Sequence, residues 1–142
     1  MEIFIVGISM LEVQKFLKEN SIEELINQFS IKVKHYPEDG LLLLNYDQLK
    51  SPKTHPVVIE CRSLILDDVS FDIISQKFPR FFNLGEFPES YSKFNWNNYH
   101  IMSKEDGSLV GVYYNPNTDN FEVSTRSMAK AEQEHDLFGN WR

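Results

Sequence analysis

The hydrophobic period of the chain changes at residue 30, and this change sets the fold class. Before it, apolar residues recur at the spacing of one helix face, behind a capping box formed by Ser21 and Glu24. After it, the segment 31–36, "IKVKHY", alternates between apolar and polar residues as a half-buried strand does. We therefore predict helical structure up to residue 30 and a sheet beyond it.

The remaining segments extend this pattern. A first helix is expected near the capping-box spacing of Ser9 and Glu12. Further apolar runs separated by turn residues predict strands at 41–46, 57–66, 70–78, 99–103, 109–114 and 121–127. The polar stretch 128–138 is expected to be helical. The predicted class is α+β, with two N-terminal helices followed by a mostly antiparallel sheet.

Composition limits the classes of protein that remain. A length of 142 residues is typical of one domain, and no apolar run approaches the roughly 18–20 residues of a membrane span. The single cysteine, Cys61, excludes an intramolecular disulfide, and a cytoplasmic location is expected. With 14 basic and 21 acidic residues, the net charge of −7 argues against a surface that grips nucleic acid as a whole. Any such contact must depend on a few well-placed cations.

The segment 103–110, "SKEDGSLV", crowds a lysine, two acids, a glycine and a serine between two predicted strands. A short hairpin needs only the Asp-Gly pair, so Lys104 can be read as an exposed hairpin lysine. Alternatively, a lysine amine that is desolvated beside such a turn is a nucleophile. The spacing alone leaves both interpretations open.

The wider context resembles a known family. "KEDGSLV" is similar to motif I of the covalent nucleotidyltransferases, which include polynucleotide ligases and mRNA capping enzymes. It occurs in order with "IECRSLIL" at 59–66, "KFPRFFNLGE" at 77–86 and "FEVSTRS" at 121–127. Together these segments resemble the N-terminal part of the phage-type RNA ligase 1 family, over about residues 40–130. The fold implied is part of a nucleotidyltransferase domain.

The resemblance implies a reaction in three steps. Lys104 would attack the α-phosphorus of ATP and hold AMP as a lysyl-AMP intermediate. The AMP would pass to the 5′-phosphate of an RNA, and a 3′-hydroxyl would then displace it. The implied cofactors are ATP and Mg²⁺, and the implied partner is RNA with 5′-phosphate and 3′-hydroxyl ends, broken transfer RNA included.

The same resemblance implies a set of site residues. Lys104 matches the nucleophile, and Arg80 stands where the family has a lysine, which keeps the charge but not the geometry. Glu60 and Arg62 are expected to share one face of a strand. The residues expected to bind ATP or its phosphates are Glu60, Arg62, Arg80, Phe82, Asn83, Asp106, Gly107, Ser108 and Arg126. No metal ligand is assigned, because the histidines lack metal-ligand spacing and the Mg²⁺ ligands are expected mostly outside this chain.

Later elements of the family cannot be found by residue 142. These are an aromatic-and-Glu element for the adenosine, a Glu-Gly element for the metal, and a pair of lysines for the triphosphate. We therefore expect the chain to be the N-terminal portion of an RNA ligase, whose missing C-terminal part would be its partner. Residues 1–30 would be a helical lead-in, 31–127 the sheet with motif I, and 128–142 a helical end. The alternatives are a non-catalytic nucleotide- or RNA-binding relic of the ligase fold, and a small α+β interaction domain.

Overall fold

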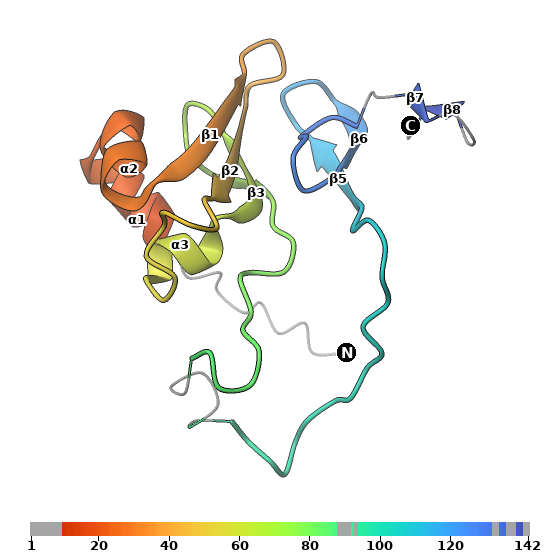
Figure 1. The fold of residues 1–142 in the computed structure, drawn as a ribbon. Coiled ribbons are helices and arrows are strands. Elements are labelled where there is room, and N and C mark those ends of the chain that lie inside the picture. The colour runs from red at the N-terminus through yellow and green to blue at the C-terminus, as the bar shows by residue number, and fades with distance from the viewer. Residues whose placement is uncertain (1–9, 88–91, 93, 132–133, 136–138, 141–142) are drawn as a thin grey trace, which may run out of the picture.

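A computed structural model describes residues 10–87, 92, 94–131, 134–135 and 139–140 (Figure 1). Two helices come first, followed by a four-stranded antiparallel sheet in the order β1-β2-β3-β4. Two separate pairs follow, β5 with β6 and β7 with β8. The bounds are α1 Glu12–Glu19, α2 Ile22–Phe29, β1 Ile31–Tyr36, β2 Leu41–Tyr46, α3 Pro56–Glu60, β3 Arg62–Asp67, β4 Ile73–Ser75, β5 Gly111–Asn115, β6 Asn120–Ser124, β7 Glu134–His135 and β8 Gly139–Asn140. The predicted α+β class is confirmed.

The capping box predicted for the second helix is present. The Ser21 hydroxyl accepts a hydrogen bond from the Glu24 backbone N–H, and the Glu24 carboxylate accepts one from the Ser21 N–H. This pair satisfies two donors that a helix start otherwise leaves without partners. Helix α1 begins at Glu12 after Leu11, and Ser9 lies outside the described residues.

Strand β2 is buried on both faces and forms the centre of the fold. Leu42 and Leu44 face the three helices, whereas Leu41 and Leu43 pack with Tyr113 of β5. Strand β3 repeats this alternation, so the continuous apolar runs in "LLLLNY" and "RSLIL" fill two cores rather than one. The result is three layers, with helices on one face of the sheet and the β5–β6 hairpin on the other.

Polar contacts hold the β5–β6 hairpin against the β1–β2 turn. The side-chain amide of Asn117 donates to the Gly40 carbonyl at 3.1 Å and to Asp67 Oδ2 at 3.0 Å. Gly40 has a φ of +66°, and a Cβ there would lie 2.6 Å from Asn117 Nδ2. Lys130 Nζ lies 2.7 Å from Asp39 Oδ1 on the same turn. Glycine at position 40 is therefore required both by the backbone and by the docked amide.

The strand predicted at 57–66 is only partly correct, because its first part is helix α3. Pro56 occupies the first helical position, where its fixed φ suits a helix and its missing N–H costs nothing. The N–H groups of Val58 and Ile59 both bond to the His55 carbonyl. Strand β3 therefore begins only at Arg62.

Two further predictions are wrong for the described residues. Residues 99–103 form no strand, since no neighbouring strand in the described part supplies their hydrogen bonds. Within 128–142, the described residues include two short strands and no helix. There the backbone follows tertiary partners instead, because the Ala131 N–H bonds to the Val123 carbonyl and the Ala129 carbonyl accepts from the Tyr113 hydroxyl. Among the described helices, none is long and apolar enough to cross a membrane.

Candidate functional site

A bulge between β2 and β3 brings the start of β3 next to the segment that follows β6. The strand register shifts at Asn45, and Ser63 has a left-handed φ of 58°. The Ser63 N–H donates to Asn45 Oδ1, and the Ser63 hydroxyl donates to the Thr125 carbonyl, both at 2.9 Å. The Asn45 amide in turn donates to the Arg126 carbonyl at 2.9 Å. These bonds fix the backbone at Arg62 and at Arg126 to one another.

Two guanidinium groups lie on the ring of Tyr46, at the end of β2. The Arg80 guanidinium carbon is 4.4 Å from the ring centroid and that of Arg126 is 5.5 Å from it. Arg80 also lies 5.4 Å from the centroid of Phe82, and its backbone N–H bonds to the Ile59 carbonyl at 2.8 Å. Its Nη1 is buried without a hydrogen-bond partner among the described residues. A buried donor without a partner is costly, so this nitrogen is suited to an anionic ligand.

Arg62 begins β3, where its backbone pairs with Asn45, the residue before Tyr46. Its Nη1 donates to the Phe78 carbonyl at 3.3 Å, and its guanidinium lies 4.8 Å from the Phe81 centroid. In the described part of the chain, none of the three guanidinium groups forms an ion pair.

We call Arg62, Arg80, Arg126 and Tyr46 the arginine cluster. The cluster carries positive charge in a chain whose net charge is −7. The nearby Glu86 carboxyl has a lowered pKa, mainly because it accepts the Asn83 N–H and in smaller part because of Lys53 and Arg80.

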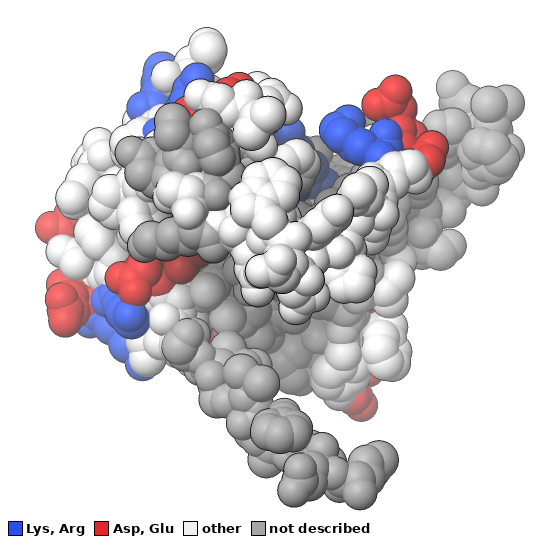
Figure 2. Space-filling view, turned by 90° about the horizontal axis from the view of Figure 1, so that it is seen from below, with Lys and Arg blue, Asp and Glu red and all other residues white. Residues whose placement is uncertain are grey.

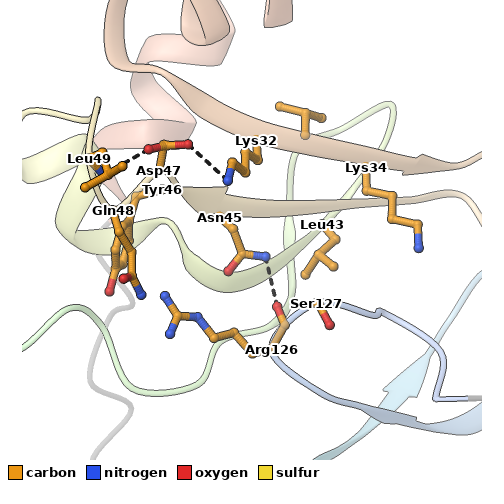
Figure 3. A pocket seen from close by; sticks show the side chains of 11 residues that line it. Lys32, Lys34, Leu43, Asn45, Tyr46, Asp47, Gln48, Leu49, Arg126 and Ser127 are labelled. Atoms are coloured by element: carbon orange, nitrogen blue, oxygen red, sulfur yellow. Dashed lines mark hydrogen bonds and ion pairs between the residues drawn. The ribbon is translucent and has the colours of Figure 1, made fainter.

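An open pocket of about 730 Å³ adjoins the arginine cluster (Figure 3). Lys32, Lys34 and Arg126 line it together with Leu43 and Tyr46. The Arg126 side chain points toward Tyr46 and Gln48, while Lys32 pairs with Asp47 at 3.0 Å. The Leu49 N–H, followed by Lys32, lowers the pKa of Asp47 to about 2. The pocket thus offers an apolar floor and a mainly basic rim.

Basic residues do not cover the face of the molecule that Figure 2 shows. In the view of Figure 2, the coloured Lys and Arg side chains form small separate patches, with white surface between them. This arrangement agrees with the expectation that a few placed cations, rather than a basic surface, would contact a phosphate.

Motif I lies apart from the arginine cluster in the structure. Residues 94–110 contain no helix or strand, and they follow an extended path that lies apart from the four-stranded sheet and ends at β5 (Figure 1). The Lys104 side chain is 78% exposed, and its Nζ lies 3.7 Å from Asp106 Oδ1. Gly107 has a φ of +141°, which accords with the need for glycine there, and Ser108 is exposed. No contact within the described residues joins Lys104 to the arginine cluster.

Comparison with known proteins identifies the family. A family model described as RNA ligase matches residues 60–141, which is more than half of the chain. The chain belongs to the RNA ligase family of the phage ligase 1 type. A protein of Autographa californica nuclear polyhedrosis virus, named as a bifunctional polynucleotide kinase/RNA ligase, is 36% identical over 132 residues. The match covers 87% of this chain and 19% of that protein's length. No solved structure matches.

Glu60 does not share a strand face with Arg62 in this ligase-family chain, so that prediction is wrong. Glu60 is the last residue of α3, and its two carboxylate oxygens accept the N–H groups of Glu12 and Val13 at 3.1 and 2.9 Å. A carboxylate at the N-terminus of a helix is favourable, and here it ties α1 to α3. Asn83 begins a turn in which its N–H donates to the Glu86 carboxylate at 2.8 Å.

Several residues near the site were not predicted from the sequence. Tyr46 was predicted only as the last residue of the strand 41–46, and nothing in its spacing marks it as a residue of the site. Lys77 lies within the segment that carries the resemblance, but nothing in the spacing distinguishes it. Burial lowers the pKa of its amine to about 8, and its Nζ lies 2.7 Å from the Ser124 hydroxyl.

The described residues show neither a metal site nor a reactive thiol. They include no group of three or more His, Cys, Asp or Glu side chains that could hold an ion. Cys61 is fully buried, and this burial raises the pKa of its thiol well above the ordinary range. Cys61 packs in the core that the helices cover.

Proposed function

We propose that this chain acts in ATP-dependent RNA joining and that Lys104 is the residue that accepts AMP. The observation that carries the proposal is the arginine cluster, in which Arg80 Nη1 is buried without a hydrogen-bond partner among the described residues. Guanidinium groups pair with phosphate oxygens in a bidentate way, so the cluster suits a triphosphate. Membership of the RNA ligase family supports the choice of reaction.

In the first step, the neutral amine of Lys104 attacks the α-phosphorus of ATP. A phosphorus–nitrogen bond forms, the bond to the bridging oxygen breaks, and pyrophosphate leaves while the amine loses a proton to solvent. Arg62, Arg80 and Arg126 would stabilise the charge that develops on the phosphates. Because Lys104 is exposed, this step requires residues 94–110 to bring the amine to the arginine cluster.

In the later steps the chain would pass AMP to an RNA. The 5′-phosphate oxygen of the RNA displaces Lys104 and takes up AMP, and a 3′-hydroxyl then attacks that phosphate and releases AMP. Gly107 and Ser108 would contact the nucleotide beside Lys104, while Phe82 and Asn83 would contact its base or ribose. Mg²⁺, when bound, would neutralise phosphate charge. The described residues do not form a site for it, so no ligand is assigned to it here.

The test is transfer of AMP to the protein. The chain is incubated with ATP labelled at the α-phosphate and with magnesium, and is then denatured. We expect label that survives denaturation and alkali but is released by acid, as a phosphorus–nitrogen bond requires. Lys104→Ala should carry no label, whereas Lys50→Ala, which changes an exposed loop lysine, should be labelled as the wild type is. Equal labelling of Lys104→Ala would exclude Lys104 as the acceptor.

A second candidate is nucleotide binding without transfer. It is favoured by the exposed position of Lys104, which lies in a segment separate from the arginine cluster. This function predicts measurable ATP binding that depends on Arg80, with no covalent label on the wild-type chain. The two functions therefore differ in the labelling experiment alone.

A further inference from the structure

Lys77 connects the two sheets at the point where the arginine cluster is built. Its Nζ lies 3.1 Å from Ser63 Oγ on β3 and 2.7 Å from Ser124 Oγ at the end of β6. The Thr125 carbonyl is a third neighbour at 3.5 Å. Ser63 directly follows Arg62, and Thr125 directly precedes Arg126. One ammonium group thus holds the two backbone segments that carry these arginines.

Among the described residues, no carboxylate forms an ion pair with this ammonium group. Glu122, the acidic residue on the same buried face of β6 as Ser124, pairs instead with Lys130 at 3.7 Å. The neighbours of the ammonium group from β3, from β5 and from the end of β6 are hydroxyl groups, a carbonyl and a glycine. The charged residues next to its partners in sequence, Arg62 and Arg126, are also cations. A cation in such a place is stabilised when an anion binds nearby.

Strand β5 closes over the Lys77 side chain. A Cβ placed on Gly111 would lie 2.6 Å from Lys77 Cε and 3.3 Å from Ser124 Oγ. Real Cβ atoms do not approach other atoms as closely as the first of these distances, so any larger residue at position 111 must displace the lysine. Gly111 therefore offers a way to move the amine without changing its chemistry.

We propose that Lys77 is a positioning residue for binding of a nucleoside triphosphate. Its ammonium group fixes the backbone segments that carry Arg62 and Arg126, and it adds positive charge near their guanidinium groups. This inference rests on the proposed function, since it assigns a further residue to the same site. Lys77 need not touch the nucleotide, because its hydrogen bonds already go to Ser63 and Ser124.

The proposal predicts a dependence on pH that a purely structural lysine would not produce. Burial lowers the pKa of Lys77 to about 8, so the amine is charged below that pH and neutral above it. Triphosphate affinity should therefore fall as the pH rises through about 8. The phosphate groups of ATP are fully ionised over this range, because their last pKa lies near 6 to 7.

The experiment measures binding of α,β-methylene-ATP with magnesium by calorimetry, since this analogue cannot transfer AMP. Between about pH 7.5 and about 9.5 we expect the wild-type Kd to rise about tenfold. Lys77→Met should raise the Kd about tenfold at the lower pH and remove the pH dependence. Lys77→Arg, which stays charged, should bind at the higher pH at least as well as the wild type does. Lys50→Met should match the wild type throughout.

Gly111→Ala keeps the measurement decisive if Lys77→Met does not fold. It should raise the Kd at the lower pH because the added methyl group displaces the amine. A wild-type Kd that does not change with pH, or an unchanged Kd in Gly111→Ala or Lys77→Met, would overturn the role of Lys77. Failure of the proposed function would give a different result. In the labelling experiment with ATP, Lys104 would then carry no acid-labile label, whatever the Kd for the analogue.

Discussion

Ser63 shows how a single residue supports the candidate site. Its left-handed φ of 58° costs roughly 1–2 kcal/mol for a residue with a side chain. The hydroxyl offsets part of this cost, because it donates to the Thr125 carbonyl and accepts a hydrogen bond from Lys77. A glycine would adopt the same backbone more easily but would lose both bonds. The strain at Ser63 is therefore balanced by contacts that also locate Arg62.

Asp47 provides a prediction for one ionisable group. Its pKa is lowered to about 2 because its carboxylate accepts the Leu49 N–H and pairs with Lys32. A carboxyl group with a lowered pKa stabilises the fold above its unfolded pKa of about 4, and this contribution is lost as the pH falls through about 2. Asp47→Asn keeps an acceptor for the Leu49 N–H but removes the charge.

The free energy of unfolding of wild type and Asp47→Asn should therefore differ at about pH 6, with the wild type more stable. The difference should shrink as the pH falls from about 4 toward 2, measured by urea unfolding at each pH. A difference that stays constant over this range would show that the charge of Asp47 does not contribute.

The β5–β6 hairpin depends on polar contacts with the first sheet. Its turn residue Asn117 bonds to the Gly40 carbonyl and to Asp67, while Asn115 bonds to the Asp39 carbonyl at 3.1 Å. These contacts join two turns that are far apart in the sequence. Hairpins of two strands are rarely stable alone, so this docking decides whether β5 and β6 form at all.

Asn117→Ala should lower the free energy of unfolding by about 1 kcal/mol, because the Gly40 carbonyl and the Asp67 carboxylate lose this donor and must accept hydrogen bonds from water instead. Chemical denaturation measures the change. Asn98→Ala is the matched control, since Asn98 is exposed in the segment 94–110 and should change stability by less than about 0.5 kcal/mol. Equal effects in the two variants would mean that the hairpin does not depend on this amide.

For the molecule as a whole, the central strand β2 determines how the layers assemble. Leu44 is fully buried against the helices, and Leu43 is 2% exposed against the hairpin layer. Each face of one strand therefore supports its own core. The site lies at the end of this strand, where Asn45 and Tyr46 follow the buried leucines.

Leu44→Ala and Leu43→Ala should each cost about 2–5 kcal/mol in the free energy of unfolding, because both leave cavities in packed cores. Leu49→Ala serves as the control, since Leu49 is 93% exposed and should change little. Denaturant unfolding followed by circular dichroism provides the measurement. A cost below about 1 kcal/mol for Leu43→Ala alone would show that the hairpin layer adds no second core.

Much of the fold follows from local pattern. The capping box at Ser21 and the alternation in 31–36 predicted α2 and β1 correctly, because caps and side-chain period act over a few residues. The pattern failed at 57–60, where β-branched residues suggested a strand but Pro56 and the His55 carbonyl start a helix. It failed again near Ala129 and Ala131, whose backbone follows partners in β5 and β6.

The candidate site was predictable only in part. Arg62, Arg80 and Arg126 were named from the sequence, and two of them meet on Tyr46. Glu60 was misplaced because its strand was assumed, and Lys77 was not recognised because its partners lie 14 and 47 residues away in the chain. Whether Lys104 joins these groups stays a prediction.

The sequence by itself determined the α+β class, the capping box of α2, the alternation of β1 and the family, because each depends on residue type and spacing along the chain. Only the tertiary structure decided that Glu60 ties α1 to α3 and that two arginines share the ring of Tyr46. It also decided that Lys77 lies between two serines under Gly111. Such contacts depend on how distant segments pack against each other, and no local pattern encodes that packing.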